Sequence, residues 1–300
     1  MDTALAEITL VLFTTIAPAG VVGYLVMALA AVCSRERERA DRISHYLVVP
    51  LVLVISGLIA SATHLGTPAN ALYVITGVGR SPLSNEVVAA VAFLVLGGVY
   101  WIVSFRDDIG RTLRVAWLGA TMFAGLVLVG FVAVAYSVPS VPTWSLPTAP
   151  ATLWLNALSS GPAVGLFGLL LAGVDPGRKM SIAVLAVAAV AAVTNAVVLM
   201  LEWQALADVV TTATRAVDLV PAFPGVAVGY VLLNAASVAL CTVALLRRPR
   251  KPVDPFAAAA ATARAHRRGL ALVGAGTLLA LLACFAVRFA FYAMHMTLGV

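Results

Sequence analysis

Residues 84–105 read SNEVVAAVAFLVLGGVYWIVSF, a run that opens with a carboxylate and is then apolar almost to its end. An α-helix needs about 20 predominantly apolar residues to cross the hydrocarbon core of a bilayer. The preceding apolar run, 43–64, has the same character and ends on His64. Polar residues, glycines and prolines separate the two runs. This pair therefore predicts two membrane-spanning helices with a short connection between them.

The rest of the chain repeats this pattern. Its 300 residues are 62% hydrophobic and 11% charged, whereas a soluble domain is roughly half apolar and about a quarter charged. The apolar runs lack the strict alternation of a membrane β-barrel. We therefore predict an all-α integral membrane protein that forms a single polytopic domain over residues 1–300. Its eight expected spans are 8–33, 43–64, 84–105, 114–138, 151–174, 181–203, 223–246 and 269–292.

The basic residues indicate how the chain is oriented. All but three of its 19 lysines and arginines fall in four connections on one side of the predicted bundle. Because connections rich in Lys and Arg stay in the cytoplasm, an even number of spans places both termini on the periplasmic or outer side. The net charge of +6 is thus an orientation signal. Charge divided among four connections does not favour a nucleic-acid partner.

Four other local patterns carry expectations. The first span lacks a basic segment before it and a clear cleavage site after it, so we expect it to be retained. Gly161 and Gly165 form a G-x-x-x-G pattern, which favours close helix packing. Asp254 and Pro255 are suited to starting a helix, which would lie along the membrane or extend the eighth span. The three cysteines form no C-x-x-C motif, so we expect no iron–sulfur or zinc site in this protein.

Few ionisable residues lie at membrane depth, where such groups are costly and often functional. His64, Glu86, Arg288 and His295 all fall near the outer face according to the span count. Each also has a structural interpretation. A glutamate in the first turn of a helix and a histidine at a helix end both suit the helix dipole. Arg288 could extend its charge to the interface or pair with Glu86.

Oxidation of a quinol is the chemistry that these residues suit best. It releases two electrons and two protons, and it needs an apolar slot with acid–base groups at its mouth. A histidine and a glutamate with pKa values near neutrality would fit that task. A haem b subunit is an alternative, because His64 and His295 could face one another. A secondary transporter is a further alternative, although it would be expected to carry polar groups near the midplane.

Several sequence blocks, in order along the protein, match one family. They are His64-Leu65-Gly66-x-Pro68, Ser84-Asn85-Glu86, Val141-Pro142-Thr143-Trp144, Leu171-Ala172-Gly173-Val174-Asp175 and Arg288-Phe289-x-Phe291-Tyr292-x-x-His295-Met296-Thr297-x-Gly299. With these blocks the sequence resembles the membrane-anchor subunits of dimethyl sulfoxide reductase and its relatives. The resemblance covers essentially the whole sequence, and the first and last blocks are its most specific parts.

This resemblance implies a multi-pass protein of a prokaryotic cytoplasmic membrane that serves anaerobic respiration. It implies partners, namely an iron–sulfur electron-transfer subunit and a molybdopterin catalytic subunit, which hold the iron–sulfur clusters and the molybdenum centre. The anchor would oxidise menaquinol to menaquinone, would contain no haem, and would be part of an oxidoreductase without holding its molybdenum centre. The quinol-site histidine and glutamate of the family fall on His64 and Glu86.

The expected site follows from the spans and the resemblance together. We expect a quinol slot near the outer face, bounded by the second and third spans, with Glu86 accepting one quinol proton and His64 binding or deprotonating the other hydroxyl. Arg288 and His295 are expected near the slot from topology alone. The outer connections 65–83 and 139–150 would dock the iron–sulfur subunit. Proton release on the side that receives the electrons would make the reaction electroneutral. Membrane lipid is the remaining expected partner.

Overall fold

The computed structural model describes residues 2–63, 74–106, 109–210, 214–246 and 255–296, without the side chains of Asp2 and of residues 255–258. Within these ranges the protein is helical, and its one β-type pairing is an isolated bridge between Val210 and Arg215. Eight helical segments are long and apolar enough to cross a membrane. The predicted all-α membrane fold and its eight spans are therefore confirmed.

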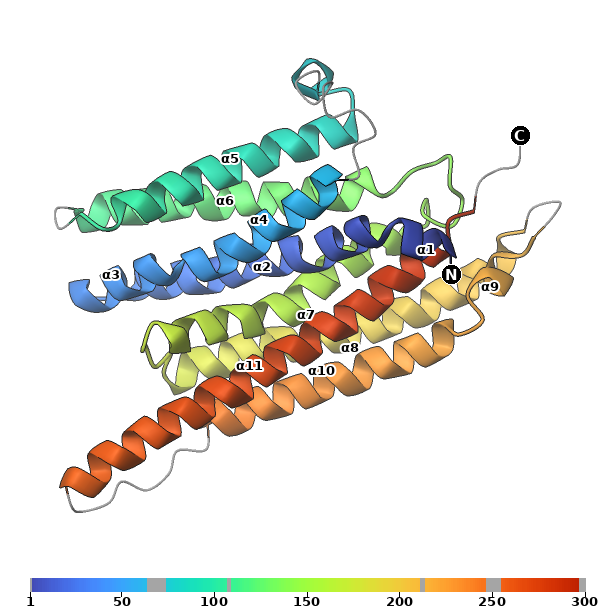
Figure 1. Ribbon diagram of the computed structural model, residues 1–300. Coiled ribbons are helices and arrows are strands. Elements are labelled where there is room, and N and C mark those ends of the chain that lie inside the picture. The colour runs from blue at the N-terminus through green and yellow to red at the C-terminus, as the bar shows by residue number, and fades with distance from the viewer. Residues whose placement is uncertain (1, 64–73, 107–108, 211–213, 247–254, 297–300) are drawn as a thin grey trace.

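The helices lie side by side along one axis (Figure 1). The long ones are α2 (Ile8–Cys33), α4 (Val48–Thr63), α5 (Pro82–Val103), α6 (Arg111–Ala135), α7 (Thr148–Leu171), α8 (Arg178–Asp208), α10 (Phe223–Leu246) and α11 (Pro255–Ala293). The shorter ones are α1 (Asp2–Ala6), α3 (Arg37–Tyr46) and α9 (Ala216–Leu219). The two termini, marked N and C, lie at the same end of the bundle (Figure 1).

Six of the eight spans have bounds that differ from the prediction, and three of these differences have a clear local cause. The second span is α3 followed by α4, because Pro50 has no N–H to donate to the Tyr46 carbonyl and its ring clashes there. Helix α5 starts at Pro82, two residues earlier than expected, with proline at the first helical position. Helix α11 starts at Pro255, so the predicted extra helix extends the eighth span.

Helices α2 and α7 form the centre of the bundle. Helix α2 packs against α4 and α6, α7 packs against α8, and the two pack against each other. A Cβ atom on Gly161 would lie 2.4 Å from the Cβ of Val22, and one on Gly165 would lie 2.6 Å from the Cβ of Val26. Only hydrogen fits at these crossings, as the G-x-x-x-G pattern predicted.

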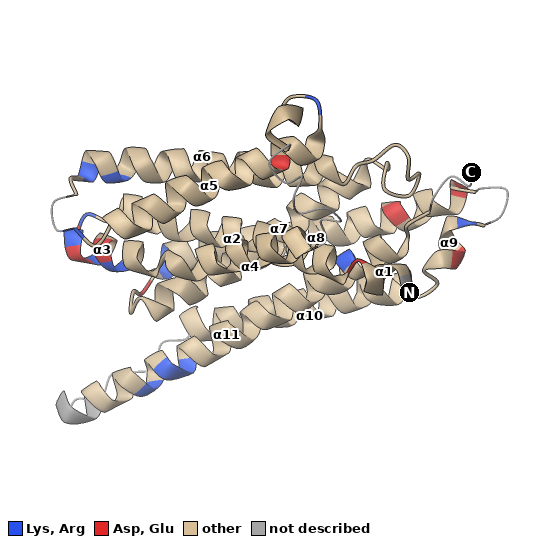
Figure 2. Cartoon of the chain, turned by 45° about the horizontal axis from the view of Figure 1, so that its top comes forward, with Lys and Arg blue, Asp and Glu red and all other residues tan. Residues whose placement is uncertain are grey.

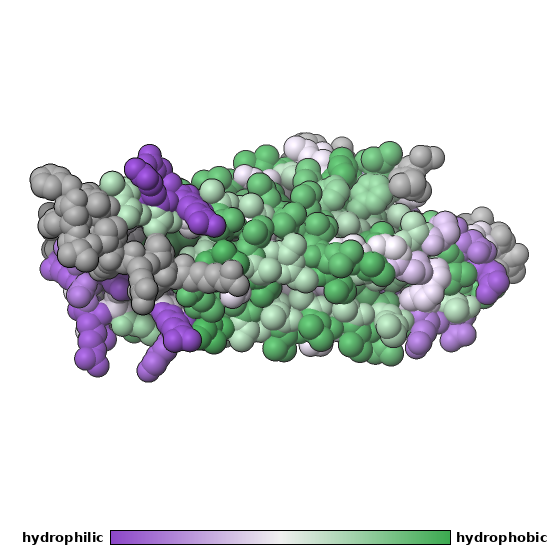
Figure 3. All heavy atoms as spheres, turned by 90° about the horizontal axis from the view of Figure 1, so that it is seen from below, coloured by the Kyte–Doolittle hydropathy of each residue, from purple (hydrophilic) through white to green (hydrophobic). Residues whose placement is uncertain are grey.

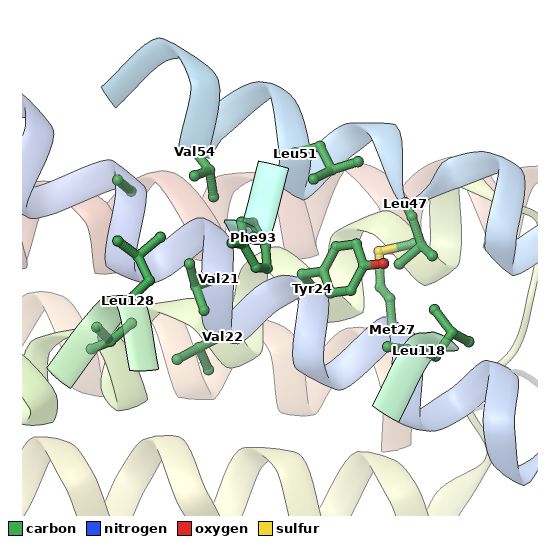
Figure 4. Packing of buried hydrophobic residues seen from close by; sticks show 14 of the residues in the cluster. Val21, Val22, Tyr24, Met27, Leu47, Leu51, Val54, Phe93, Leu118 and Leu128 are labelled. Carbon is green, nitrogen blue, oxygen red and sulfur yellow. The ribbon is translucent and has the colours of Figure 1, made fainter. Parts of the chain in front are cut away.

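Two main hydrophobic cores lie on either side of this central pair. The first joins α2, α4, α5, α6 and α7; in it the rings of Tyr24 and Phe93 meet edge to face at 5.4 Å between centroids (Figure 4). The second joins α8, α10, α11 and the connection around Trp144. The second core lies toward the end of the bundle that holds both termini.

The outer surface matches a bilayer. Apolar side chains cover the middle of the face seen in Figure 3, and hydrophilic ones lie toward its two ends. Lysines and arginines gather at the end of the bundle that holds α3 and the start of α11, opposite the marked termini (Figure 2). We call these the basic end and the terminal end. By the positive-inside rule the basic end is cytoplasmic, which stays a prediction.

Candidate functional site

Glu86 lies on α5 near the terminal end, and the turn before the helix fixes its position. Gly79 takes a positive φ of 80°, and its N–H donates to the side-chain oxygen of Asn85 at 2.7 Å. Ser81 caps the helix by accepting the Ser84 N–H at 3.4 Å. Because α5 begins at Pro82, Glu86 falls beyond the first helical turn.

This placement corrects the helix-dipole interpretation of Glu86. The first turn of α5 holds no acidic residue, and the stabilising effect of the dipole falls off within that turn. The Glu86 side chain is 2% exposed, and its Oε2 atom is buried without a hydrogen-bond partner. A buried carboxyl oxygen with no partner is costly. The structure thus leaves Glu86 with an unfilled hydrogen-bonding position inside the protein.

Arg288, on α11, is buried in the same part of the bundle at 1% exposure. Its Nε donates to the Thr14 hydroxyl of α2 at 3.0 Å. Its guanidinium lies 4.2 Å from the ring centroid of Phe291 and 5.3 Å from that of Tyr292, distances at which cation–π attraction operates. One terminal nitrogen, Nη2, has no hydrogen-bond partner. Arg288 therefore does not extend to the interface, and it forms no ion pair with Glu86.

Two tyrosines, Tyr136 and Tyr292, lie in the same part of the bundle as Arg288. Tyr136 follows the last residue of α6, and its hydroxyl interacts electrostatically with both Glu86 and Arg288. Its ring meets that of Tyr292 edge to face at 5.9 Å. The Tyr292 hydroxyl is buried close to Thr14, Tyr136 and Arg288, but it meets the geometry of a hydrogen bond with none of them.

A second buried carboxyl, Glu202 on α8, completes the group. It is 2% exposed and interacts electrostatically with Arg288. An opposite charge is what a buried guanidinium needs to offset its lost hydration. We call Thr14, Glu86, Tyr136, Glu202, Arg288 and Tyr292 the buried polar cluster. Its members come from α2, α5, α8, α11 and the residue after α6.

The connection before α7 holds the end of α11 in place. The Thr143 hydroxyl donates to the Met294 carbonyl at 2.6 Å, and the Trp144 indole N–H donates to the Phe291 carbonyl at 2.9 Å. These two bonds tie the connection before α7 to the end of α11. His295, just past α11, packs its ring against Trp144 with centroids 4.8 Å apart. It therefore lies at the edge of the cluster, because Trp144 also contacts the Tyr292 ring.

The four sequence-predicted site residues have different outcomes. Glu86 and Arg288 are both buried, and Tyr136 interacts electrostatically with each of them. His295 lies at the edge, and His64 falls outside the described residues, just past the end of α4. Sequence reasoning assigned no role to Glu202, Thr14 or Tyr136. A hydroxyl inside an apolar helix and a tyrosine at a helix end are common, so neither carried a specific signal.

Comparison with known proteins places this architecture in one family. A family model described as DMSO reductase anchor subunit (DmsC) matches residues 1–257. The chain belongs to the DMSO reductase anchor subunit family. The family resemblance that the sequence blocks suggested is thus confirmed, and the protein is a multi-pass membrane anchor subunit of a prokaryote.

Individual anchor-family relatives match along nearly their whole length. The DmsC-type subunit of anaerobic dimethyl sulfoxide reductase from Escherichia coli K12 is 31% identical over 296 residues, covering 98% of this protein and 96% of the relative. The YnfH subunit of an anaerobic dimethyl sulfoxide reductase from the same organism is 30% identical over 297 residues, with 98% and 96% covered. The corresponding subunit from Haemophilus influenzae is 26% identical over 300 residues, with 100% and 98% covered.

Proposed function

We propose that this anchor subunit oxidises menaquinol at the buried polar cluster and passes the electrons to an iron–sulfur partner subunit. A molybdopterin catalytic subunit would then consume those electrons. The observation that carries the proposal is the set of buried polar atoms without partners at the terminal end. They are Glu86 Oε2, Tyr292 Oη and Arg288 Nη2. A bound quinol, with a hydroxyl at each end of its ring, would offer hydrogen-bond partners to such atoms.

The proton chemistry assigns a role to each group. Oxidation of one menaquinol to menaquinone releases two protons and two electrons. Glu86 accepts one proton, since a carboxylate that is buried and lacks a partner has a free oxygen for it. Arg288 stays charged and donates a hydrogen bond to the oxygen that becomes a carbonyl. The second proton goes to His64, as the sequence predicts, and the electrons go to the iron–sulfur subunit.

Glu202 and Thr14 support this chemistry from the other side of Arg288. Glu202 supplies the opposite charge, and Thr14 fixes the direction of the Nε–H bond. An arginine held by a hydroxyl, an aromatic ring and a distant carboxylate keeps its orientation when a ligand arrives. Preorganised donors of this kind stabilise developing charge without reorganising.

Photoaffinity labelling would locate the quinol directly. The assembled complex is irradiated with an azido-menaquinone, with and without excess menaquinol, and the labelled peptides are sequenced by mass spectrometry. The proposal expects label within residues 82–90 of α5 and within 285–296 of α11, and protection of both by menaquinol. Protected label that is confined to α3, or to the start of α8, would place the quinol at the opposite end and contradict it.

A further inference from the structure

A pocket of about 490 Å³ lies at the basic end, far from the buried polar cluster. The end of α2, the start of α3 and the connection between α7 and α8 line this open pocket. Four basic residues and one acidic residue, Glu36, line it. The basic residues are Arg35, Arg39, Arg178 and Lys179. A pocket with this balance of charge is suited to an anion.

The start of α8 adds backbone donors to the pocket. Gly177 takes a positive φ of 77° and donates its N–H to Asp175 Oδ1 at 2.8 Å, whereas the N-cap residue offers no side-chain acceptor to the first turn of the helix. The first helical hydrogen bond runs from the Ser181 N–H to the Gly177 carbonyl at 3.0 Å. The N–H groups of residues 178–180 therefore have no acceptor within the helix. Uncapped N–H groups at the positive end of a helix of 31 residues attract anions.

Arg39 supplies an independent indication of a ligand. One of its terminal nitrogens donates to the Asp175 carbonyl at 2.8 Å, so the side chain bridges α3 and the connection before α8. Its Nε atom is buried and has no hydrogen-bond partner. An arginine held in place with a buried unpaired N–H is a donor that lacks its acceptor. Arg39 lines the pocket, so a bound anion there would supply that acceptor.

The first turn of α8 carries positive charge at the end of the helix where negative charge is preferred. It holds Arg178 and Lys179 and no acidic residue, although cations are unfavourable at this end of a helix dipole. A bound anion would offset that cost. Ala30 and Met180 add apolar surface beside the charges. The pocket thus combines basic groups that can bind an anion with apolar side chains that can contact a lipid acyl chain.

We propose that this pocket binds a phosphate group, carried by an anionic lipid headgroup or present as free phosphate. Guanidinium forks and helix N-termini are the usual partners of phosphate oxygens. The basic end is the end that the positive-inside rule places among cytoplasmic headgroups, where basic pockets between helices hold anionic lipids. The site is separate from the proposed quinol chemistry, and either proposal can fail without the other.

Lipid retention tests the pocket with a matched pair of variants. The full-length protein is released from nanodiscs of equal phosphatidylglycerol and phosphatidylcholine, and bound lipids are counted by native mass spectrometry. In Arg39→Gln/Arg178→Gln we expect phosphatidylglycerol retention to fall by about tenfold or more. In Arg264→Gln/Arg267→Gln the same charge is removed from exposed residues of α11 at the same end, and retention should match the unmodified protein. Equal retention by all three proteins, or equal loss in both variants, would exclude a specific lipid site.

Cys33 gives a second readout that needs no variant. It is exposed and lines the pocket, whereas Cys241 and Cys284 are buried. An uncharged maleimide should label Cys33 several-fold more slowly when the pocket is filled. Slower labelling in phosphatidylglycerol discs than in phosphatidylcholine discs identifies a lipid. Slowing by inorganic phosphate in phosphatidylcholine discs identifies free phosphate. Equal rates under all conditions would overturn the proposal.

Discussion

At the scale of single residues, the candidate site depends on how the cost of burying the charge of Arg288 is offset. The Nε of Arg288 donates a hydrogen bond to Thr14, and its guanidinium lies over the ring of Phe291. Glu202 interacts with it electrostatically. Removing a charge that offsets a buried guanidinium lowers stability, although by less than breaking a directly paired buried salt bridge, which typically costs about 3–5 kcal/mol. The arginine is therefore as much a structural element as a ligand-binding one.

A double-mutant cycle measures this coupling. Arg288→Gln should lower the thermal midpoint of the purified protein, because it leaves Glu202 buried without its opposite charge. Adding Glu202→Gln should recover part of the loss, with a coupling free energy of roughly 1 kcal/mol or more. Strictly additive losses in the two single variants and the double variant would show that the two side chains do not interact.

At the scale of elements, the site depends on how closely the central helices approach. Arg288 reaches Thr14 because α11 packs against α2, and α2 is held against α7 by Gly161 and Gly165. Overpacking such a crossing forces the helices apart and typically costs about 1–3 kcal/mol. A substitution that separates α2 from α7 should therefore also displace side chains of the buried polar cluster.

Gly161→Ala tests the importance of this crossing. The added methyl would lie 2.4 Å from the Val22 Cβ, so we expect the thermal midpoint to fall and quinol oxidation by the complex to weaken. Gly119→Ala on α6 is the control, because nothing lies within 4 Å of a Cβ built there. Equal midpoints in the two variants would mean that α2 and α7 can separate without cost.

The elements also show how far sequence reasoning reaches. The apolar runs predicted the eight spans, because hydrocarbon thickness fixes helix length. The runs also placed Glu86 and Arg288 at one end, because helix count alone decides which ends share a face. Tyr136 and Thr14 escaped detection, because their roles arise from contacts between helices far apart in sequence. The start of α5 at Pro82, and with it the burial of Glu86 past the first turn, depended on the preceding turn.

At the scale of the whole molecule, charge is distributed unequally between the two ends. The basic end carries most lysines and arginines (Figure 2), and the buried polar cluster lies toward the terminal end. If the basic end is cytoplasmic, as the positive-inside rule predicts, quinol oxidation takes place near the outer face. The two proposed sites then serve opposite leaflets of the same membrane.

Cys33 reports on this orientation. It is the exposed cysteine of the three and lies at the basic end. A membrane-impermeant maleimide should label it in inside-out vesicles and leave it unlabelled in sealed right-side-out ones. The reverse pattern would invert the topology and move the buried polar cluster to the cytoplasmic face.

Orientation also predicts the energetics of turnover. Protons released at the outer face, on the same side as the electrons received by the partner subunit, move no net charge across the membrane. Quinol-driven turnover in sealed vesicles should therefore leave a potential-sensitive dye unchanged. A sustained potential that an uncoupler abolishes would contradict electroneutral oxidation.

The central claim is that Glu86 belongs to the quinol site, and one comparison tests it most directly. Turnover of the assembled complex is measured for Glu86→Gln with menaquinol, and separately with an artificial donor that reduces the catalytic subunit without the anchor. Glu38→Gln, which alters an exposed glutamate at the basic end, is the control. We predict that Glu86→Gln loses about tenfold or more of the menaquinol rate, somewhat below the usual effect of removing a general base, while the artificial-donor rate and the control remain normal. Full menaquinol oxidation by Glu86→Gln would contradict the account.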